Sequence, residues 1–316
     1  MARNPFRRIV RVLAYSPPVT AFVGFTKRLV IPGFDGLPLY DVADFFFTGI
    51  HKGSIKTRAS SLAFSFFLAL FPAIIFLFTL IPYIPIQNFQ DQLLELIRNV
   101  LPSNAYESTR DTIEDIVKHQ RRGLLSLGFL LALYFTSNGF MAMIKGFNTS
   151  YHVVESRGPW RRRGAALVLT FILSVLVMLA TVLIVFGQTT SKYFVKKHII
   201  KNATQLHIVA STRWAIILAL ILFSISFLYY YGPAVKKRWK LFSAGSTLAT
   251  ALTICTSIGF AYYVNNFANY NKLYGSIGTL IVVMLWIYFN SVILILGFEL
   301  NASIDNAKRR KFATKE

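Results

Sequence analysis

The chain has 316 residues, of which 54% are hydrophobic and only 15% are charged. A soluble domain usually carries about 25% charged residues, so this composition argues against a soluble protein. The 34 basic and 13 acidic residues give a net charge of +21, and a strongly basic chain often binds nucleic acid. Here the basic residues flank long apolar stretches, which argues for a membrane protein without a nucleic-acid partner.

The first 58 residues form a basic N-terminal region. Pro17 and Pro18 break its only early apolar run, so no cleavable signal peptide is predicted. Residues 40–50 place Val42, Phe45 and Phe46 among polar residues, which predicts a short amphipathic helix lying on the cytoplasmic face of the membrane. A partly disordered basic tail is the alternative for this region.

Six apolar stretches follow, each close to the about 20 residues that a spanning helix needs. They cover residues 60–82, 124–149, 165–188, 214–232, 244–264 and 275–298. We therefore predict an all-α, polytopic membrane bundle of six transmembrane helices over residues 59–305. A basic cytoplasmic tail, residues 306–316, should follow the bundle.

The segment between the first two spans, residues 83–123, has a different pattern. Apolar residues from Phe89 to Val100 recur every three or four positions, which is typical of an amphipathic helix. Leu101 and Pro102 end this pattern, and Tyr106 to Val117 repeats it. The segment should form an extracytoplasmic helical hairpin over the outer ends of the spans.

The distribution of Lys and Arg predicts that both termini are cytoplasmic, because cytoplasmic loops are enriched in these residues. Most of the 34 basic residues fall in the segments that this topology places inside, including Arg161 to Arg163 and Lys308 to Lys311. Lys192, Lys196 and Lys197 are exceptions in an outer loop. The inner basic groups should bind anionic headgroups of membrane lipids.

Polar residues inside the spans are the candidate functional residues, since polar groups in lipid are costly and usually face protein or water. They follow single helix faces, and the set comprises Asn138, Lys145, Asn148, Ser246, Thr250, Thr253, Ser257, Trp286, Asn290, Glu299 and Asn301. They line a substrate pathway or, alternatively, only hold the helices together, as small polar residues commonly do in membranes. Lys145 and Glu299 lie at similar depths, so they either form an ion pair or reach separately to water.

The junction before the sixth span combines amides, phenols and glycines. Tyr274, Gly275 and Gly278 lie there, after several Asn residues in 265–271. Such a segment suits either a binding site for a polar group or an ordinary interfacial belt.

Several segments together resemble the YihY/virulence factor BrkB family of bacterial inner-membrane proteins, which is also called ribonuclease BN. They are residues 62–72, 147–151, Glu155 with Arg157 and Arg161 to Arg163, 274–278, 285–288 and 297–301. The resemblance runs from about residue 40 to 305, although Phe298 and Ala244 replace the alanine and the proline that members usually carry. It implies a six-helix inner-membrane protein.

The ribonuclease name finds no support in the residues. Metal-dependent hydrolysis needs clustered His and carboxylate ligands, whereas the five His residues are scattered, and Cys255 is the only cysteine. There is also no phosphate-binding loop or nucleophile elbow. We therefore expect no catalytic residue, no metal site and no cofactor.

Two function classes remain. A transporter or lipid translocator accounts for polar residues in several spans. A non-transporting envelope scaffold or lipid-binding protein accounts equally for the basic inner rim. The sequence favours the transport class and indicates no substrate, coupling ion or oligomeric state.

Overall fold

The computed structural model describes residues 24–52, 54–83, 89–100, 103–150, 155–196, 203–234, 242–266 and 269–313. Within these residues the chain forms helices and turns, and the only strand-like pairing described is an isolated antiparallel bridge between Val30 and Pro38. This confirms the predicted all-α class.

Six helices contain stretches long and apolar enough to cross a membrane. They are α4 (Ile55–Leu80), α7 (Arg122–Ser150), α8 (Pro159–Lys196), α9 (Ala203–Tyr231), α10 (Ala244–Asn266) and α11 (Asn269–Ala313). A short 3-10 turn, η1 (Ile81–Tyr83), extends α4. The predicted number of spanning helices is thus confirmed.

The last helix is much longer than predicted. The expected outer junction 265–274 is largely helical, because α10 ends at Asn266 and α11 already begins at Asn269. The expected tail from residue 306 also belongs to α11, which ends at Ala313. No proline follows Pro233 in the sequence, so no residue of that type forces α11 to end where its apolar stretch ends.

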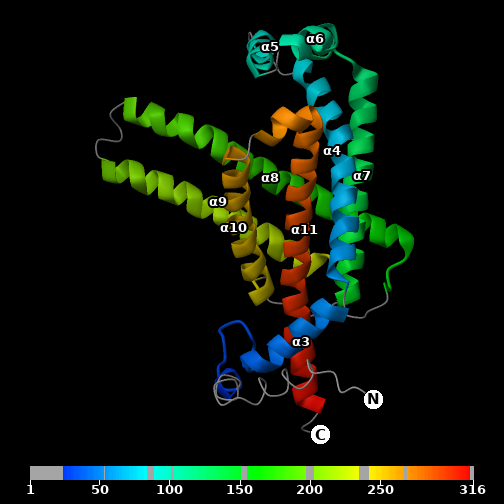
Figure 1. The fold of residues 1–316 in the computed structure, drawn as a ribbon, viewed down its shortest axis with the longest axis vertical. Helices are drawn as coiled ribbons and strands as arrows, with labels where there is room; N and C mark the ends of the chain where they lie inside the picture. The colour runs from blue at the N-terminus through cyan, green and yellow to red at the C-terminus, as the bar shows by residue number, and fades with distance from the viewer. Residues whose placement is uncertain are drawn as a thin grey trace.

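Three shorter helices lie at the two ends of the bundle (Figure 1). The stretch predicted as an amphipathic helix is helical in α3 (Leu39–Lys52), and the two stretches predicted for the hairpin are helical in α5 (Phe89–Val100) and α6 (Ser103–Lys118). That α5 and α6 form an extracytoplasmic hairpin stays a prediction. Val42 and Leu37 pack against Leu300 and Ile304, so α3 and the turn before it cover the extension of α11. We name the two ends of the bundle the α3 end and the α6 end; that the α3 end is cytoplasmic stays a prediction.

The main core lies toward the α3 end. Its residues come from the first parts of α4, α8 and α10 and from the last parts of α7, α9 and α11. They include Leu62, Phe140, Met143, Ile144, Phe147, Leu169, Leu228, Tyr229, Ala249, Ile293 and Phe298. All six spanning helices therefore meet in this half of the bundle.

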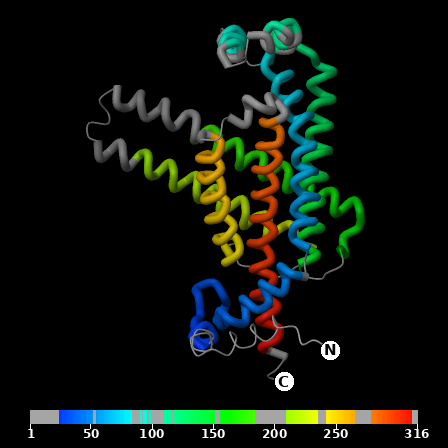
Figure 2. Tube along the Cα trace, in the orientation of Figure 1, coloured from blue at the N-terminus to red at the C-terminus, as the bar shows by residue number. Residues whose placement is uncertain are grey.

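The other half is more open. Figures 1 and 2 show α8 and α9 running side by side and leaning away from α10 and α11 toward the α6 end. Val177 of α8 is 63% exposed and Ile258 of α10 is 66% exposed. Among the described helices α4 and α7 pack closely, and Gly128 lets α7 approach the backbone of Phe76. The core thus joins all six spanning helices at one end of the bundle, and α8 and α9 diverge from α10 and α11 in the other half.

Candidate functional site

A buried ion pair joins three helices at the α3 end. The Arg58 Nη2 atom lies 3.2 Å from the Glu299 Oε2 atom, and the two side chains are only 8% and 5% exposed. Ser150 connects them, because its hydroxyl donates to the same Glu299 oxygen at 2.6 Å and accepts from Arg58 Nη1 at 2.6 Å. Arg58 also donates to the Gly146 carbonyl at 2.9 Å. This arrangement ties α4, α7 and α11 together through one carboxylate.

The α3 helix forms a wall beside this carboxylate. A Cβ atom at Gly49 would lie 2.1 Å from the Glu299 Oε1 atom, so glycine is required for α3 to approach so closely. Both oxygens of Glu299 are therefore enclosed by protein, one by Gly49 and the other by Arg58 and Ser150.

Of the two alternatives for Lys145 and Glu299, an ion pair between them or separate contact with water, neither describes Glu299, which is buried and paired with another residue. Lys145 is exposed, and Glu299 pairs with Arg58 instead. An arginine has five donors in a planar fork, so it can satisfy a buried carboxylate, a hydroxyl and a carbonyl together. A single lysine ammonium can reach water from the bundle surface at lower cost.

Asn301, two residues after Glu299, fastens α10 to α11. Its Oδ1 atom accepts from the Gly245 N–H at 2.8 Å, and its Nδ2 atom donates to the Ser243 hydroxyl at 2.8 Å. Ser243 and Ser246 bond reciprocally across the start of α10, which is the geometry of a capping box. Asn301 and this box thus satisfy N–H groups that the first turn of a helix leaves free.

An aromatic cluster lies beside these polar groups. The rings of Phe147 and Phe298 stack at 4.1 Å, and Tyr229 meets Phe147 edge-on at 5.5 Å. The Tyr229 hydroxyl donates to the Leu294 carbonyl at 2.7 Å. Phe298, one of the two residues that depart from the pattern of the family that the sequence resembles, therefore adds one face of this stack. We call Phe147, Tyr229, Phe298, Arg58 and Glu299 the inner plug.

A second polar network holds the loop between α7 and α8. Asn148 donates to Glu155 at 2.8 Å and accepts from the Ala234 N–H at 2.9 Å. Arg157 bonds Glu155 at 2.7 Å and the Gly232 carbonyl at 2.9 Å. Burial raises the pKa of Glu155, but the hydrogen bonds and charge of Arg157 and the amide of Asn148 leave it below its usual value. This network joins the ends of α7 and α9.

Asn138 has a different partner. Its Oδ1 atom accepts a hydrogen bond from Arg163 Nη1, and the Arg163 guanidinium also lies over the Tyr134 ring at 4.7 Å. These contacts join α7 to the second turn of α8.

The polar residues of α10 and α11 divide into two groups. Ser246 and Thr250 are buried near the plug, and the Thr250 hydroxyl donates back to the Ser246 carbonyl. Thr253, Ser257 and Asn290 are half-buried further toward the α6 end, where Trp286 is 42% exposed. Gly278 is buried, whereas Tyr274 and Gly275 lie in α11 at positions whose side chains are outside the described residues.

Sequence reasoning missed several residues of the site: Arg58, Ser150, Gly49, Tyr229 and Ser243. Arg58 had a usable signal, since it stands among small residues at the start of an apolar span. Among the described residues, no group of three or more His, Cys, Asp or Glu side chains is placed to hold a metal ion.

The fold and this buried polar site define a multi-pass helical membrane protein. The family model of virulence factor BrkB matches residues 46–316, and the chain belongs to this family.

Ribonuclease-like protein YfkH of Bacillus subtilis is 32% identical over 260 residues, which cover 82% of this chain and 93% of that protein. UPF0761 membrane protein RSc1559 of Ralstonia nicotianae is 29% identical over 80% of this chain. UPF0761 membrane protein XCC0860 of Xanthomonas campestris is 26% identical over 78% of it. The chain spans 56% of the length of each of these last two relatives. No solved structure matches it.

Proposed function

We propose that this protein moves a solute or a lipid across the bacterial inner membrane. The observation that supports the proposal is the unequal closure of the bundle. A plug of aromatic rings and a buried ion pair fills the α3 end, whereas half-buried polar side chains lie above it in the more open half. A route closed at one side and accessible from the other is what alternating access requires of a transporter.

Two of the polar residues beyond the plug, Thr253 and Asn290, lie at similar depth. The backbones of α10 and α11 touch at Gly245 and Gly297. Thr253 follows Gly245 by about 12 Å and Asn290 precedes Gly297 by about 10 Å, at ~1.5 Å per residue. Because the two helices run in opposite directions, both residues lie at the same level beyond the plug.

An envelope scaffold remains the second candidate, and one observation favours it. Hydroxyls of Thr170, Thr250 and Ser291 donate to carbonyls four residues earlier in their own helices. Side chains satisfied in this way pack against neighbouring helices without needing water.

Cysteine accessibility separates these candidates. In a Cys255→Ser background, Thr253→Cys and Asn290→Cys should react with a small water-soluble thiol reagent, whereas Thr250→Cys should not, because Thr250 is 8% exposed beside the plug. Ile258→Cys is the matched control: Ile258 is 66% exposed on the same helix as Thr253, and lipid should cover it. Inertness of Thr253→Cys and Asn290→Cys, while Glu107→Cys in α6 reacts, would favour the scaffold.

We further propose that the chain is not an enzyme. The ribonuclease-like name belongs to the Bacillus relative, and an assay of purified protein with RNA and Mg²⁺, Mn²⁺ or Zn²⁺ should show no cleavage above a matched control.

A further inference from the structure

We propose that the groove between α4 and α11 binds an anionic phospholipid, with one acyl chain in the groove and the phosphate at Lys56. The site is separate from the inner plug, and lipid binding there does not require transport.

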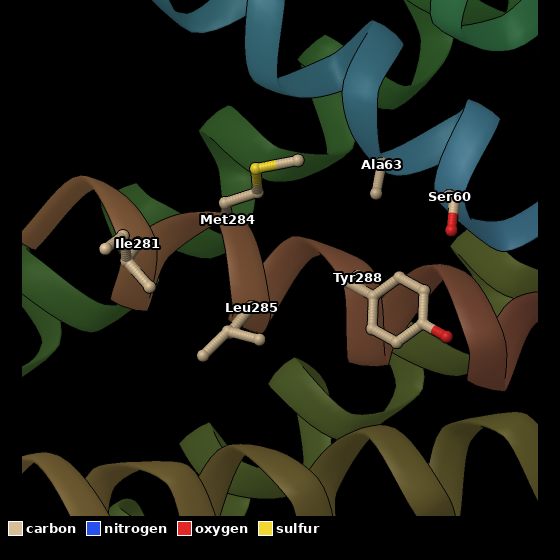
Figure 3. Close-up of a pocket in the computed structure, with 6 residues that line it drawn as sticks. All are labelled: Ser60, Ala63, Ile281, Met284, Leu285 and Tyr288. Atoms are coloured by element: carbon tan, nitrogen blue, oxygen red, sulfur yellow. The ribbon is translucent and has the colours of Figure 1, made fainter.

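The groove is apolar and open to the bilayer. It has a volume of ≈ 210 Å³ and is lined by Ser60 and Ala63 of α4 and by Ile281, Met284, Leu285 and Tyr288 of α11 (Figure 3). The α11 residues follow one helix face at spacings of three and four. Ile281, Met284 and Leu285 are 39%, 38% and 41% exposed, so the groove faces the surrounding lipid and not the core.

The volume of the groove favours a narrow ligand such as an acyl chain. Sites for whole small molecules usually have about 300–1,000 Å³, and a helix with its side chains is about 10 Å wide. A cavity of ≈ 210 Å³ is too small for either but suits part of one acyl chain. Its walls lie on spanning segments of α4 and α11, which is where acyl chains are found.

A positive charge marks the end of the groove nearest the α3 end. Lys56 precedes Ser60 by four residues and Ala63 by seven, so the three lie on one face of α4. Lys56 is exposed, about 6 Å from the level of Ser60. Among the side chains that the structure describes, no carboxylate forms an ion pair with Lys56, whereas Arg58 on another face is committed to Glu299. A phosphate at the membrane surface is the expected partner of such a lysine.

Native mass spectrometry of protein extracted from vesicles of equal phosphatidylglycerol and phosphatidylcholine tests the proposal. Ser60→Phe fills the groove and should remove one retained phospholipid, while the neighbouring Ser61→Phe, also exposed, should not. Lys56→Gln should lower the preference for phosphatidylglycerol at this site about fivefold, which corresponds to about 1 kcal/mol per near-surface lysine. Lys145→Gln, an exposed lysine on α7, is its matched control.

An unchanged preference for phosphatidylglycerol in Lys56→Gln, together with unchanged phospholipid retention in Ser60→Phe and thermal unfolding like that of the wild type, would overturn the proposal. Loss of a dimer mass in Ser60→Phe without loss of lipid would also overturn it and assign the groove to a second copy of the chain. The cysteine-accessibility result is independent of both outcomes, because Thr253 and Asn290 do not line the groove.

Discussion

The two halves of this bundle are built from the same six helices but are held together differently. At the α3 end, side chains from every spanning helix share one core, and the buried side chains of Glu299 and Asn301 form hydrogen bonds with other helices. Toward the α6 end, α8 and α9 diverge from α10 and α11, and the described residues of the main core do not extend there. Helix association in membranes depends on close packing and hydrogen bonds rather than on exclusion of water. The contrast therefore indicates that the α3 end fixes the architecture and that the other half is freer to rearrange.

The largest effect should come from breaking the buried ion pair. Arg58→Leu leaves Glu299, which is 5% exposed, with the Ser150 hydroxyl as its remaining described partner, and an unpaired buried charge typically costs about 3–5 kcal/mol of unfolding free energy. Chemical unfolding in detergent micelles measures this loss.

Two variants keep that experiment interpretable. The double variant Arg58→Leu/Glu299→Leu should recover part of the loss, because an apolar pair replaces both charges. Arg110→Leu removes an exposed pair with Glu114 in α6 and should leave stability unchanged. If Arg58→Leu and Arg110→Leu were equally mild, the ion pair would not hold the α3 end together.

An intermediate effect should follow from adding one methyl group to α10 at its two ends. A Cβ atom at Gly245 would lie 2.0 Å from the Gly297 carbonyl oxygen, so Gly245→Ala must push α10 away from α11. Overpacking of this kind costs about 1–3 kcal/mol. Gly259, on the same helix toward the α6 end, has nothing within 4 Å of its Cβ position, and Gly259→Ala should stabilise the helix by up to about 1 kcal/mol. A lower unfolding temperature for Gly245→Ala and a higher one for Gly259→Ala would support the contrast between the halves. Changes in the same direction would contradict it.

The same contrast explains what was predictable from the sequence. The spanning helices were predictable, because an apolar run of about 20 residues has few other structures available to it in a membrane. Glu299 and Asn301 stood out because polar groups in an apolar helix need partners. The residues that pair with them could not be identified from the sequence. Arg58 lies 241 residues from Glu299, and their pairing depends on how α4 and α11 are rotated against each other. The close approach of Gly49 to Glu299 depends on the same tertiary geometry, and no local pattern encodes it.

Tyr229→Phe should have the smallest measurable effect. The Tyr229 side chain is 2% exposed, and its hydroxyl donates to the Leu294 carbonyl at 2.7 Å. The substitution keeps the ring in contact with Phe147 and Phe298 and removes only the hydrogen bond. Such a hydrogen bond between membrane helices contributes about 0.6 kcal/mol to stability on average. Tyr230→Phe is the matched control, because Tyr230 is 51% exposed and its side chain faces outward from the core. Unfolding midpoints in detergent should fall slightly for Tyr229→Phe and stay constant for Tyr230→Phe. A loss of several kcal/mol for Tyr229→Phe would mean that this hydroxyl, and not ring packing, holds α9 on α11.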